Sequence, residues 1–242
     1  NIFMGKFHLF WNYIPGLCRF FGILTCMTTN FEILLVDVDR TLYPFECNVW
    51  DAIGERIHDF IHIKLGLSEE DARQLRLSLR EKYPTTWQGL HEEYDIDKDE
   101  YLRFIHEVDL ASLLPPNPVL PVLFAALPQK KVIFTNSTRY HAGRVLDYFS
   151  IKPYFSDIID VTMINPYTKF EREAFPLALE YLGNPTPGSC VMIDDEETII
   201  DNAIASGMQG VLVNSAPQQN GHQHMQISSI NFLADALAQL SE

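Results

Sequence analysis

Short runs of consecutive apolar residues alternate along the chain with stretches in which apolar residues recur every three or four positions. The apolar runs are rich in β-branched residues, which is typical of strands buried on both faces of a parallel sheet. They lie at residues 33–36, 131–134, 190–193 and 210–213. Helical spacing predicts helices at about 141–149, 171–182, 198–206 and 231–240. This alternation predicts an α/β fold with a doubly wound, Rossmann-like parallel sheet.

The segment between the first two predicted strands has a different pattern. Residues 44–114 show helical periodicity and no strand-like run, with apolar residues at every fourth position over 49–65. Ser68, followed by Asp71 three positions later, predicts the start of a further helix. We therefore predict an all-helical cap at residues 44–114, inserted into one α/β core. The core is then formed by residues 27–43 and 115–242. The polar stretch 214–229 is predicted to be a loop.

Composition and charge restrict the partners of this chain. Of its 242 residues, 47% are hydrophobic. The chain contains 18 Lys and Arg residues and 32 Asp and Glu residues, which gives a net charge of -14. This is the composition of an ordinary globular protein. The acidity argues against binding a nucleic acid polymer through a basic surface, so any anionic ligand must be bound by local positive charge.

The N-terminal segment and the cysteines bear on location. Residues 1–26 are aromatic-rich but interrupted by polar residues, proline and glycine, so they are too broken to span a bilayer. Met27 resembles a natural start, and we predict that residues 1–26 form a peripheral or upstream segment; an organellar or membrane-surface role is the alternative. Four scattered cysteines form no disulfide or zinc pattern, which favours a reducing, cytoplasmic location.

Polar residues follow three of the predicted strands. Asp37 and Asp39 come after the first, Thr135 after the second, and Asp194 with Asp195 after the third. In doubly wound sheets ligands bind outside the carboxyl ends of the strands, so these side chains are expected to lie together. Two carboxylates two positions apart can divide the roles of nucleophile and proton shuttle, although the same spacing also occurs in turns and calcium loops.

Together with a later lysine, Lys169, these residues resemble the motifs of the haloacid-dehalogenase superfamily of phosphohydrolases, and the resemblance covers residues 27 to about 214. Within that superfamily the chain is most similar to pyrimidine 5'-nucleotidases. The similar segments are residues 37–44, 83–90, 104–106, 134–137, 141–142 and 144–146. The match at 83–90 is the most specific, because this cap region differs between subfamilies.

The resemblance implies a role for each motif residue. Asp37 would be the nucleophile that forms an aspartyl-phosphate, and Asp39 the acid and base. Thr135 and Lys169 would bind the phosphoryl oxygens. Mg²⁺ would be held by Asp37, the backbone carbonyl of Asp39, and Asp194 and Asp195. A dehalogenase needs no acid for the leaving group, so Asp39 favours phosphate ester hydrolysis.

Further residues are candidates for substrate contacts. These are Asn136 and Ser137 in the core and Tyr83, Thr86 and Trp87 in the cap. An aromatic side chain can stack on a nucleobase, but packing within the cap explains Tyr83 and Trp87 equally well. His141 and Arg144 share one helix face, which we interpret as solvent-exposed, contact with the cap being the alternative.

Three residues depart from the pattern of the resembling family. Arg40 stands where a small residue is usual, and it could contact phosphate, pair with Asp39 or Asp195, or point to solvent. Phe170 replaces a usual proline after Lys169. Ile199 stands where many relatives carry a second acidic or amide residue, so the metal site is expected to depend more on Asp194 and Asp195.

The sequence therefore predicts an enzyme, a Mg²⁺-dependent phosphatase that acts on a small phosphorylated metabolite. The resemblance favours a pyrimidine nucleoside 5'-monophosphate, over which the cap closes to exclude water. The alternatives are a phosphatase for another metabolite, such as a sugar phosphate, and a catalytically weakened nucleotide-binding module in which Arg40 occupies the phosphate pocket.

Overall fold

The computed structural model describes residues 30–83, 85–214 and 224–241, so the prediction for residues 1–26 lies outside the described residues. Six parallel strands form one sheet in the order β3-β2-β1-β4-β5-β6. The strands are β1 (Ile33–Val36), β2 (Lys130–Phe134), β3 (Asp157–Ile159), β4 (Cys190–Asp194), β5 (Gln209–Val213) and β6 (Met225–Ile227). This strand order confirms the predicted doubly wound, Rossmann-like sheet.

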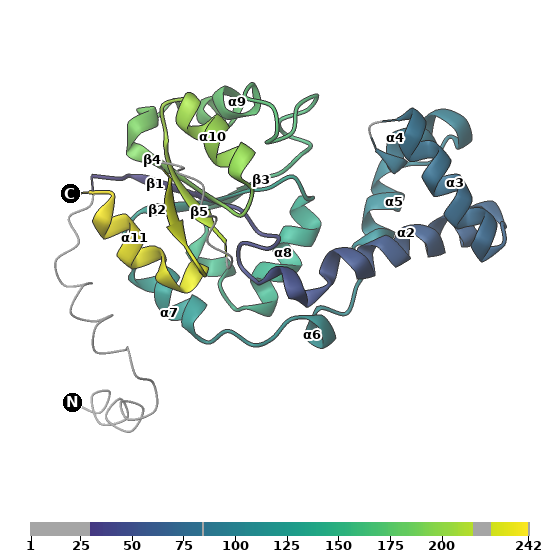
Figure 1. Cartoon of the computed structure of the whole chain (residues 1–242), viewed down its shortest axis with the longest axis horizontal. Coiled ribbons are helices and arrows are strands. Elements are labelled where there is room, and N and C mark those ends of the chain that lie inside the picture. The colour runs from purple at the N-terminus through teal and green to yellow at the C-terminus, as the bar shows by residue number, and fades with distance from the viewer. Residues whose placement is uncertain (1–29, 84, 215–223, 242) are drawn as a thin grey trace.

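Helices cover both faces of the sheet. Within β1, Leu34 and Val36 pack into one hydrophobic cluster, and Ile33 and Leu35 pack into the other. One face carries α7 (Val119–Ala126), α8 (Arg139–Tyr148) and α11 (Leu233–Gln239). The opposite face carries α9 (Ala174–Tyr181) and α10 (Glu197–Ala205) (Figure 1). Burial on both faces is why the strand sequences are continuously apolar instead of alternating.

The two outermost strands were not predicted. β3 and β6 have three residues each and lie at the two edges of the sheet. Such short segments give no periodic signal, and the prediction that all of 214–229 is a loop is wrong at β6. The described residues also form four short 3₁₀ segments. These are η1 (Phe45–Cys47), η2 (Lys152–Tyr154), η3 (Pro187–Ser189) and η4 (Ile230–Phe232).

The cap consists of helices, as predicted. They are α2 (Val49–Leu65), α3 (Glu69–Lys82), α4 (Thr86–Tyr94), α5 (Lys98–Ile105) and the short α6 (Leu110–Leu113) in the return to the core. Helix α2 packs against α3 and α5. Ser68 caps α3, its side chain accepting a hydrogen bond from the backbone N–H of Asp71 at 3.1 Å.

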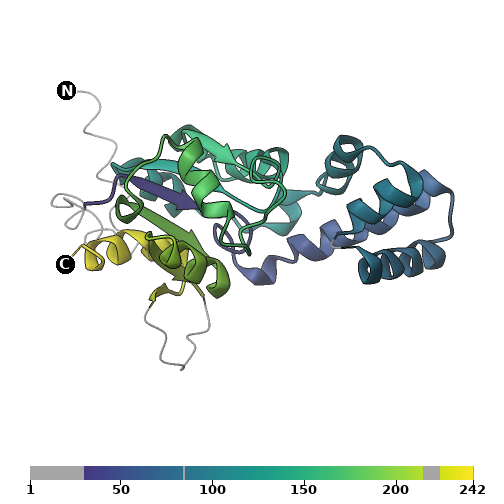
Figure 2. The same ribbon diagram turned by 90° about the horizontal axis from the view of Figure 1, so that it is seen from above.

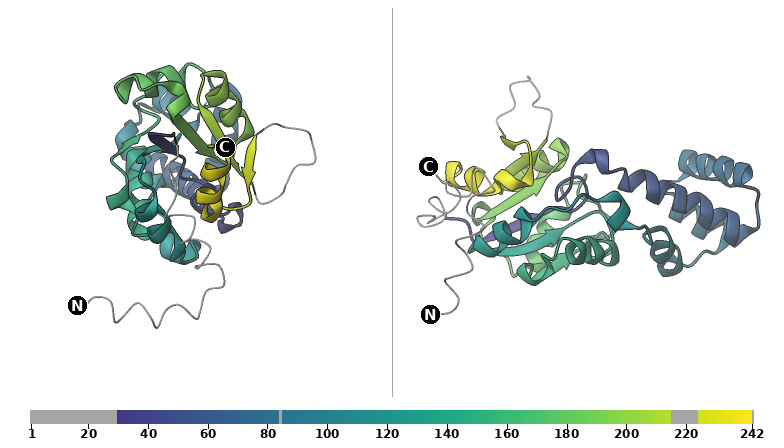
Figure 3. Two further views of the ribbon diagram at one scale, coloured as in Figure 1. Left: turned by 90° about the vertical axis from the view of Figure 1, so that its left-hand side faces the viewer. Right: turned by 90° about the horizontal axis from the view of Figure 1, so that it is seen from below.

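The group α2–α5 stands beside the core, beyond the carboxyl ends of the strands (Figures 1, 2 and 3). Chain segments before α2 and around α6 join it to the core (Figure 1). None of the helices in the described part of the chain combines the length and the apolar character needed to cross a membrane.

The contact between β5 and α10 gives a prediction about stability. A Cβ atom on Gly210 would lie 2.6 Å from Cγ2 of Ile200 and 3.3 Å from Cδ1 of Ile204. We expect Gly210→Ala to lower the free energy of unfolding in urea by about 1–3 kcal/mol, because the helix must shift away from the sheet.

Gly54→Ala in α2 is the matched control, since its Cβ would meet only the guanidinium of Arg76, at 3.5 Å. It should leave stability unchanged or raise it by up to about 1 kcal/mol, because alanine favours helix. Equal effects of the two substitutions would contradict this packing.

Candidate active site

A cavity of about 210 Å³ opens at the carboxyl ends of the central strands. Asp37 directly follows β1, Thr135 follows β2, and Asp194 ends β4; β1 lies between the other two strands. The structure therefore brings together every core residue that the sequence singled out as catalytic, metal-binding or substrate-binding. All of them line the cavity: Asp37, Asp39, Thr135, Asn136, Ser137, Lys169, Asp194 and Asp195.

Lys169 lies in the middle of this cluster with only 1% of its surface exposed. Its Nζ donates to Oδ1 of Asp37 at 2.5 Å and to Oδ2 of Asp194 at 2.7 Å. Burial alone would lower the pKa of Lys169, but the carboxylates of Asp194 and Asp37 outweigh it and raise the pKa above its usual value. The ammonium is therefore charged and available to an anionic ligand.

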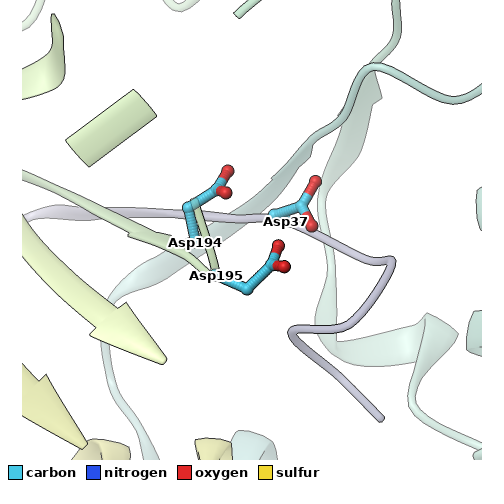
Figure 4. Close-up of side chains that lie close together, drawn as sticks. All are labelled: Asp37, Asp194 and Asp195. Atoms are coloured by element: carbon cyan, nitrogen blue, oxygen red, sulfur yellow. The ribbon is translucent and has the colours of Figure 1, made fainter. Parts of the chain in front are cut away.

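Three carboxylates form a set that fits a divalent cation. One oxygen each of Asp37, Asp194 and Asp195 lies within 4.8 Å of the others, at the ends of β1 and β4 (Figure 4). Carboxylate oxygens are the ligands that Mg²⁺ prefers in proteins. Burial raises the pKa of Asp195 to about 7, with the charges of Asp194 and Glu196 adding to it. Burial likewise raises the pKa of Asp37, although Lys169 opposes the shift. These three carboxylates therefore repel one another, and a bound cation would reduce that repulsion.

Asp39 is held by three hydrogen bonds. Tyr43 Oη donates to Oδ1 and Ser137 Oγ to Oδ2, while Nε2 of His141 lies 2.7 Å from Oδ1. Burial alone would raise the pKa of Asp39, but His141 and the donors Ser137 and Tyr43 lower it far below its usual range. In this arrangement Asp39 is a carboxylate, and it binds a proton less readily than an ordinary aspartate does.

The interpretation of the His141 and Arg144 face as solvent-exposed is wrong. His141 is fully buried, and its ring centroid lies 5.0 Å from that of His106, which follows the last residue of α5. Arg144 donates to the backbone carbonyl of His106 and, at 2.7 Å, to that of Val108. This face of α8 instead contacts the segment that returns from the cap. The contact of His141 with Asp39 joins residues 102 positions apart, so local spacing gave no sign of it.

The residues that depart from the family pattern lie around the cavity. Arg40 has a positive φ of 64°, and its guanidinium lies 3.8 Å from Glu196 and over the ring of Phe45. It pairs with neither Asp39 nor Asp195. Phe170, 52% exposed, and Ile199, buried in the first turn of α10, both line the cavity. Trp50 in the first turn of α2 also lines the cavity, and the sequence gave no signal for it.

The predicted binding residues of the core also have partners within the protein. Thr135 Oγ1 accepts a hydrogen bond from the backbone N–H of Ser137 at 3.0 Å. Asn136 Oδ1 accepts one from the backbone N–H of Lys169 at 2.8 Å. Asn136 therefore sets the position of the loop that carries Lys169.

The predicted cap residues lie elsewhere. Tyr83 donates from its hydroxyl to Glu93, Thr86 is buried at the start of α4, and Trp87 stacks on His91. The structure places them within the cap and not among the residues that line the cavity at Asp37. Their role as substrate contacts stays a prediction.

Comparison with known proteins identifies relatives. A family model for haloacid dehalogenase-like hydrolases matches residues 31–207. Phosphate metabolism protein 8 of Saccharomyces cerevisiae is 25% identical over 205 residues, which cover 75% of this chain and 61% of that protein. The chain thus spans less than two thirds of the length of this relative.

Solved structures with the same fold include a HAD phosphatase from Thermococcus onnurineus, with a TM-score of 0.61 and 23% identity. Another is the HAD-hydrolase YfnB from Bacillus subtilis, bound to magnesium and showing interdomain movement, with a TM-score of 0.54 and 17% identity. Each alignment covers 86% of this chain and 98% of the other. At these identities the likeness shows the fold alone.

The raised pKa of Asp195 gives a prediction about pH and stability. An unfolded aspartate has an ordinary pKa near 3.9, whereas Asp195 in the folded, metal-free protein titrates at about 7. The contribution of Asp195 to folding therefore becomes less favourable as pH rises from about 4 to 7, and this loss is constant above that range.

We expect Asp195→Asn to raise the thermal midpoint in EDTA. The increase should grow between pH 4 and 7 and correspond to at most about 4 kcal/mol at pH 8. Asp59→Asn, at an exposed position on α2, is the control and should show no such trend. If the rise in thermal midpoint caused by Asp195→Asn does not change with pH, the raised pKa of Asp195 is refuted.

Proposed function

The chain belongs to the family of haloacid dehalogenase-like hydrolases, and from this premise we propose that it is a Mg²⁺-dependent phosphomonoester hydrolase. The observation that supports this most is the convergence of Asp37, Asp39 and the buried ammonium of Lys169 on one cavity at the strand ends. A fold hosts many reactions, so the site and not the sheet carries the assignment.

Asp37, Asp194 and Asp195, with the backbone carbonyl of Asp39, would hold Mg²⁺, because their oxygen donors suit this ion. When bound, the ion neutralises negative charge on the phosphoryl group and on the surrounding carboxylates. The magnesium reported for YfnB, a protein of the same fold, supports this choice.

In the first displacement a carboxylate oxygen of Asp37 attacks phosphorus, and the bond from phosphorus to the leaving oxygen breaks. The product is an aspartyl-phosphate on Asp37. The ammonium of Lys169 and the Thr135 hydroxyl stabilise the phosphoryl oxygens. Asp39, once protonated, gives its proton to the leaving oxygen.

In the second displacement water attacks the phosphorus of the aspartyl-phosphate. Asp39 takes a proton from that water, the bond between Asp37 and phosphorus breaks, and inorganic phosphate forms. The carboxylate state of Asp39, with its three hydrogen bonds, suits this second step. In the first displacement Asp39 must be protonated to act as an acid, although its hydrogen bonds favour the carboxylate.

The substrate we propose is a pyrimidine nucleoside 5'-monophosphate. Trp50 and Phe170 present exposed aromatic surface at the cavity, and bases stack on aromatic side chains. The segments at 37–44 and 83–90, which resemble pyrimidine 5'-nucleotidases, support the same choice. Tyr83, Thr86 and Trp87 would reach the base after a movement of the cap, as the interdomain movement of YfnB suggests.

The central test is phosphate release from p-nitrophenyl phosphate. We expect the wild type to be active with Mg²⁺ and inactive in EDTA, and Asp37→Asn to lose activity by at least about 10³-fold, because no nucleophile remains. Asp59→Asn, on the exposed surface of α2, is the matched control and should retain full activity. A wild type that binds nucleotides but releases no phosphate with Mg²⁺ would refute the enzyme assignment in favour of a binding module.

A panel of substrates tests the proposed specificity. We expect kcat/KM for UMP and CMP to exceed the values for sugar phosphates by at least about tenfold, since one base-stacking contact is worth roughly 1–3 kcal/mol. We also expect it to exceed the values for AMP and GMP, as the resemblance to pyrimidine 5'-nucleotidases implies. Trp50→Ala should remove most of the preference for nucleotides over sugar phosphates while leaving activity on a sugar phosphate. Equal rates on all of these compounds would overturn the nucleotidase proposal but not the phosphatase proposal.

A further inference from the structure

The hydrogen bonds of Asp39 are distributed unequally between its two oxygens. Oδ1 accepts from Tyr43 and from His141, whose Nε2 lies at 2.7 Å, while Ser137 is the one donor to Oδ2 in the described part of the chain. Each carboxylate oxygen offers about two lone-pair sites. Oδ1 is therefore fully occupied, whereas Oδ2 keeps one site without a donor among the described residues, and Asp39 lines the cavity.

His141 is suited to hold Oδ1 in place. Its ring is fully buried, and Nδ1 has no hydrogen-bond partner among the described residues. Because a carboxylate only accepts, Nε2 carries the hydrogen of this bond. The bond to Asp39 is thus the one polar interaction of the ring within the described residues, and no second interaction competes for its orientation.

Packing fixes the same ring from the side of the cap. The ring of His106 stands against it, with centroids 5.0 Å apart and planes tilted by 37°. His106 in turn is tied to helix α8, because Arg144 donates to its backbone carbonyl and to that of Val108. Helix α8 therefore binds Asp39 through His141 and, about one turn later, binds the chain returning from the cap through Arg144.

We infer that His141 is a positioning residue for the proton transfer at the active site: it occupies Oδ1 of Asp39, together with Tyr43, so that the proton is exchanged at Oδ2. This inference rests on the proposed phosphatase function. The proton on Oδ2 passes to the leaving oxygen as the bond between phosphorus and that oxygen breaks, and Oδ2 later takes a proton from the attacking water. His141 itself neither touches the substrate nor transfers the proton.

Two substrates with different leaving groups distinguish a positioning role of His141 from a general structural role. The alkoxide released from UMP needs a proton as it departs, whereas the phenolate released from p-nitrophenyl phosphate leaves without one. Misplacing Asp39 should therefore slow the first displacement for UMP far more than for the aryl ester. Structural damage would lower both rates by the same factor.

The experiment compares kcat/KM for both substrates in the 242-residue chain with Mg²⁺, because kcat/KM contains only the steps through the first displacement, in which the leaving groups differ. We expect His141→Met, which removes the donor at similar volume, to lower kcat/KM for UMP on the order of 10- to 100-fold and for the aryl phosphate by less than about fivefold. His141→Gln, which retains an N–H donor, should restore most of the activity on UMP. His62→Met, at an exposed position of the cap, is the matched control and should leave both substrates unaffected.

Tyr43→Phe provides a second test of the same carboxylate oxygen should His141→Met fail to fold, because it removes the other donor to Oδ1. It should show the same preference for the aryl ester. The positioning inference would be overturned if every variant that folds lost activity equally on the two substrates, or if His141→Gln did not restore activity on UMP. Neither result would contradict the phosphatase activity of the wild type. A wild type inactive on both substrates would overturn the proposed function and this inference with it.

Discussion

The site depends on offsetting the repulsion among carboxylates held at one edge of a buried sheet. Oxygens of Asp37, Asp194 and Asp195 lie within 4.8 Å of one another, where burial weakens the solvation of their charges. The ammonium of Lys169 bridges two of them, and a cation fits among all three. The positive charge that a chain of net charge -14 lacks overall is thus provided locally.

This constraint explains the surrounding architecture. A parallel sheet brings the ends of β1 and β4 side by side, and the backbone of Asp37 is fixed to Ile193 by a hydrogen bond of 2.9 Å. Lys169 reaches the same point from a loop, which Asn136 holds through its side-chain oxygen. The cap joins the core beside this edge, so Trp50 on its first helix lines the cavity. The fold supplies the geometry, and these few side chains supply the chemistry.

The sequence predicted what depends on short-range pattern. Consecutive apolar runs located the four longer strands, and polar residues at their ends located the cavity. Edge strands β3 and β6 were missed because three residues carry no periodicity. The bond from His141 to Asp39 and the pairing of Arg40 with Glu196 were missed as well, since such contacts depend on the tertiary arrangement and not on spacing.

The central claim is that Asp37 carries the phosphoryl group during turnover. The most direct measurement is to quench the protein in acid while it hydrolyses p-nitrophenyl phosphate with Mg²⁺, and to determine peptide masses by mass spectrometry. The account predicts the added mass of one phosphoryl group on the peptide that contains Asp37, and none in Asp37→Asn. Phosphate released at the full rate by a protein without a carboxylate at position 37 would contradict it.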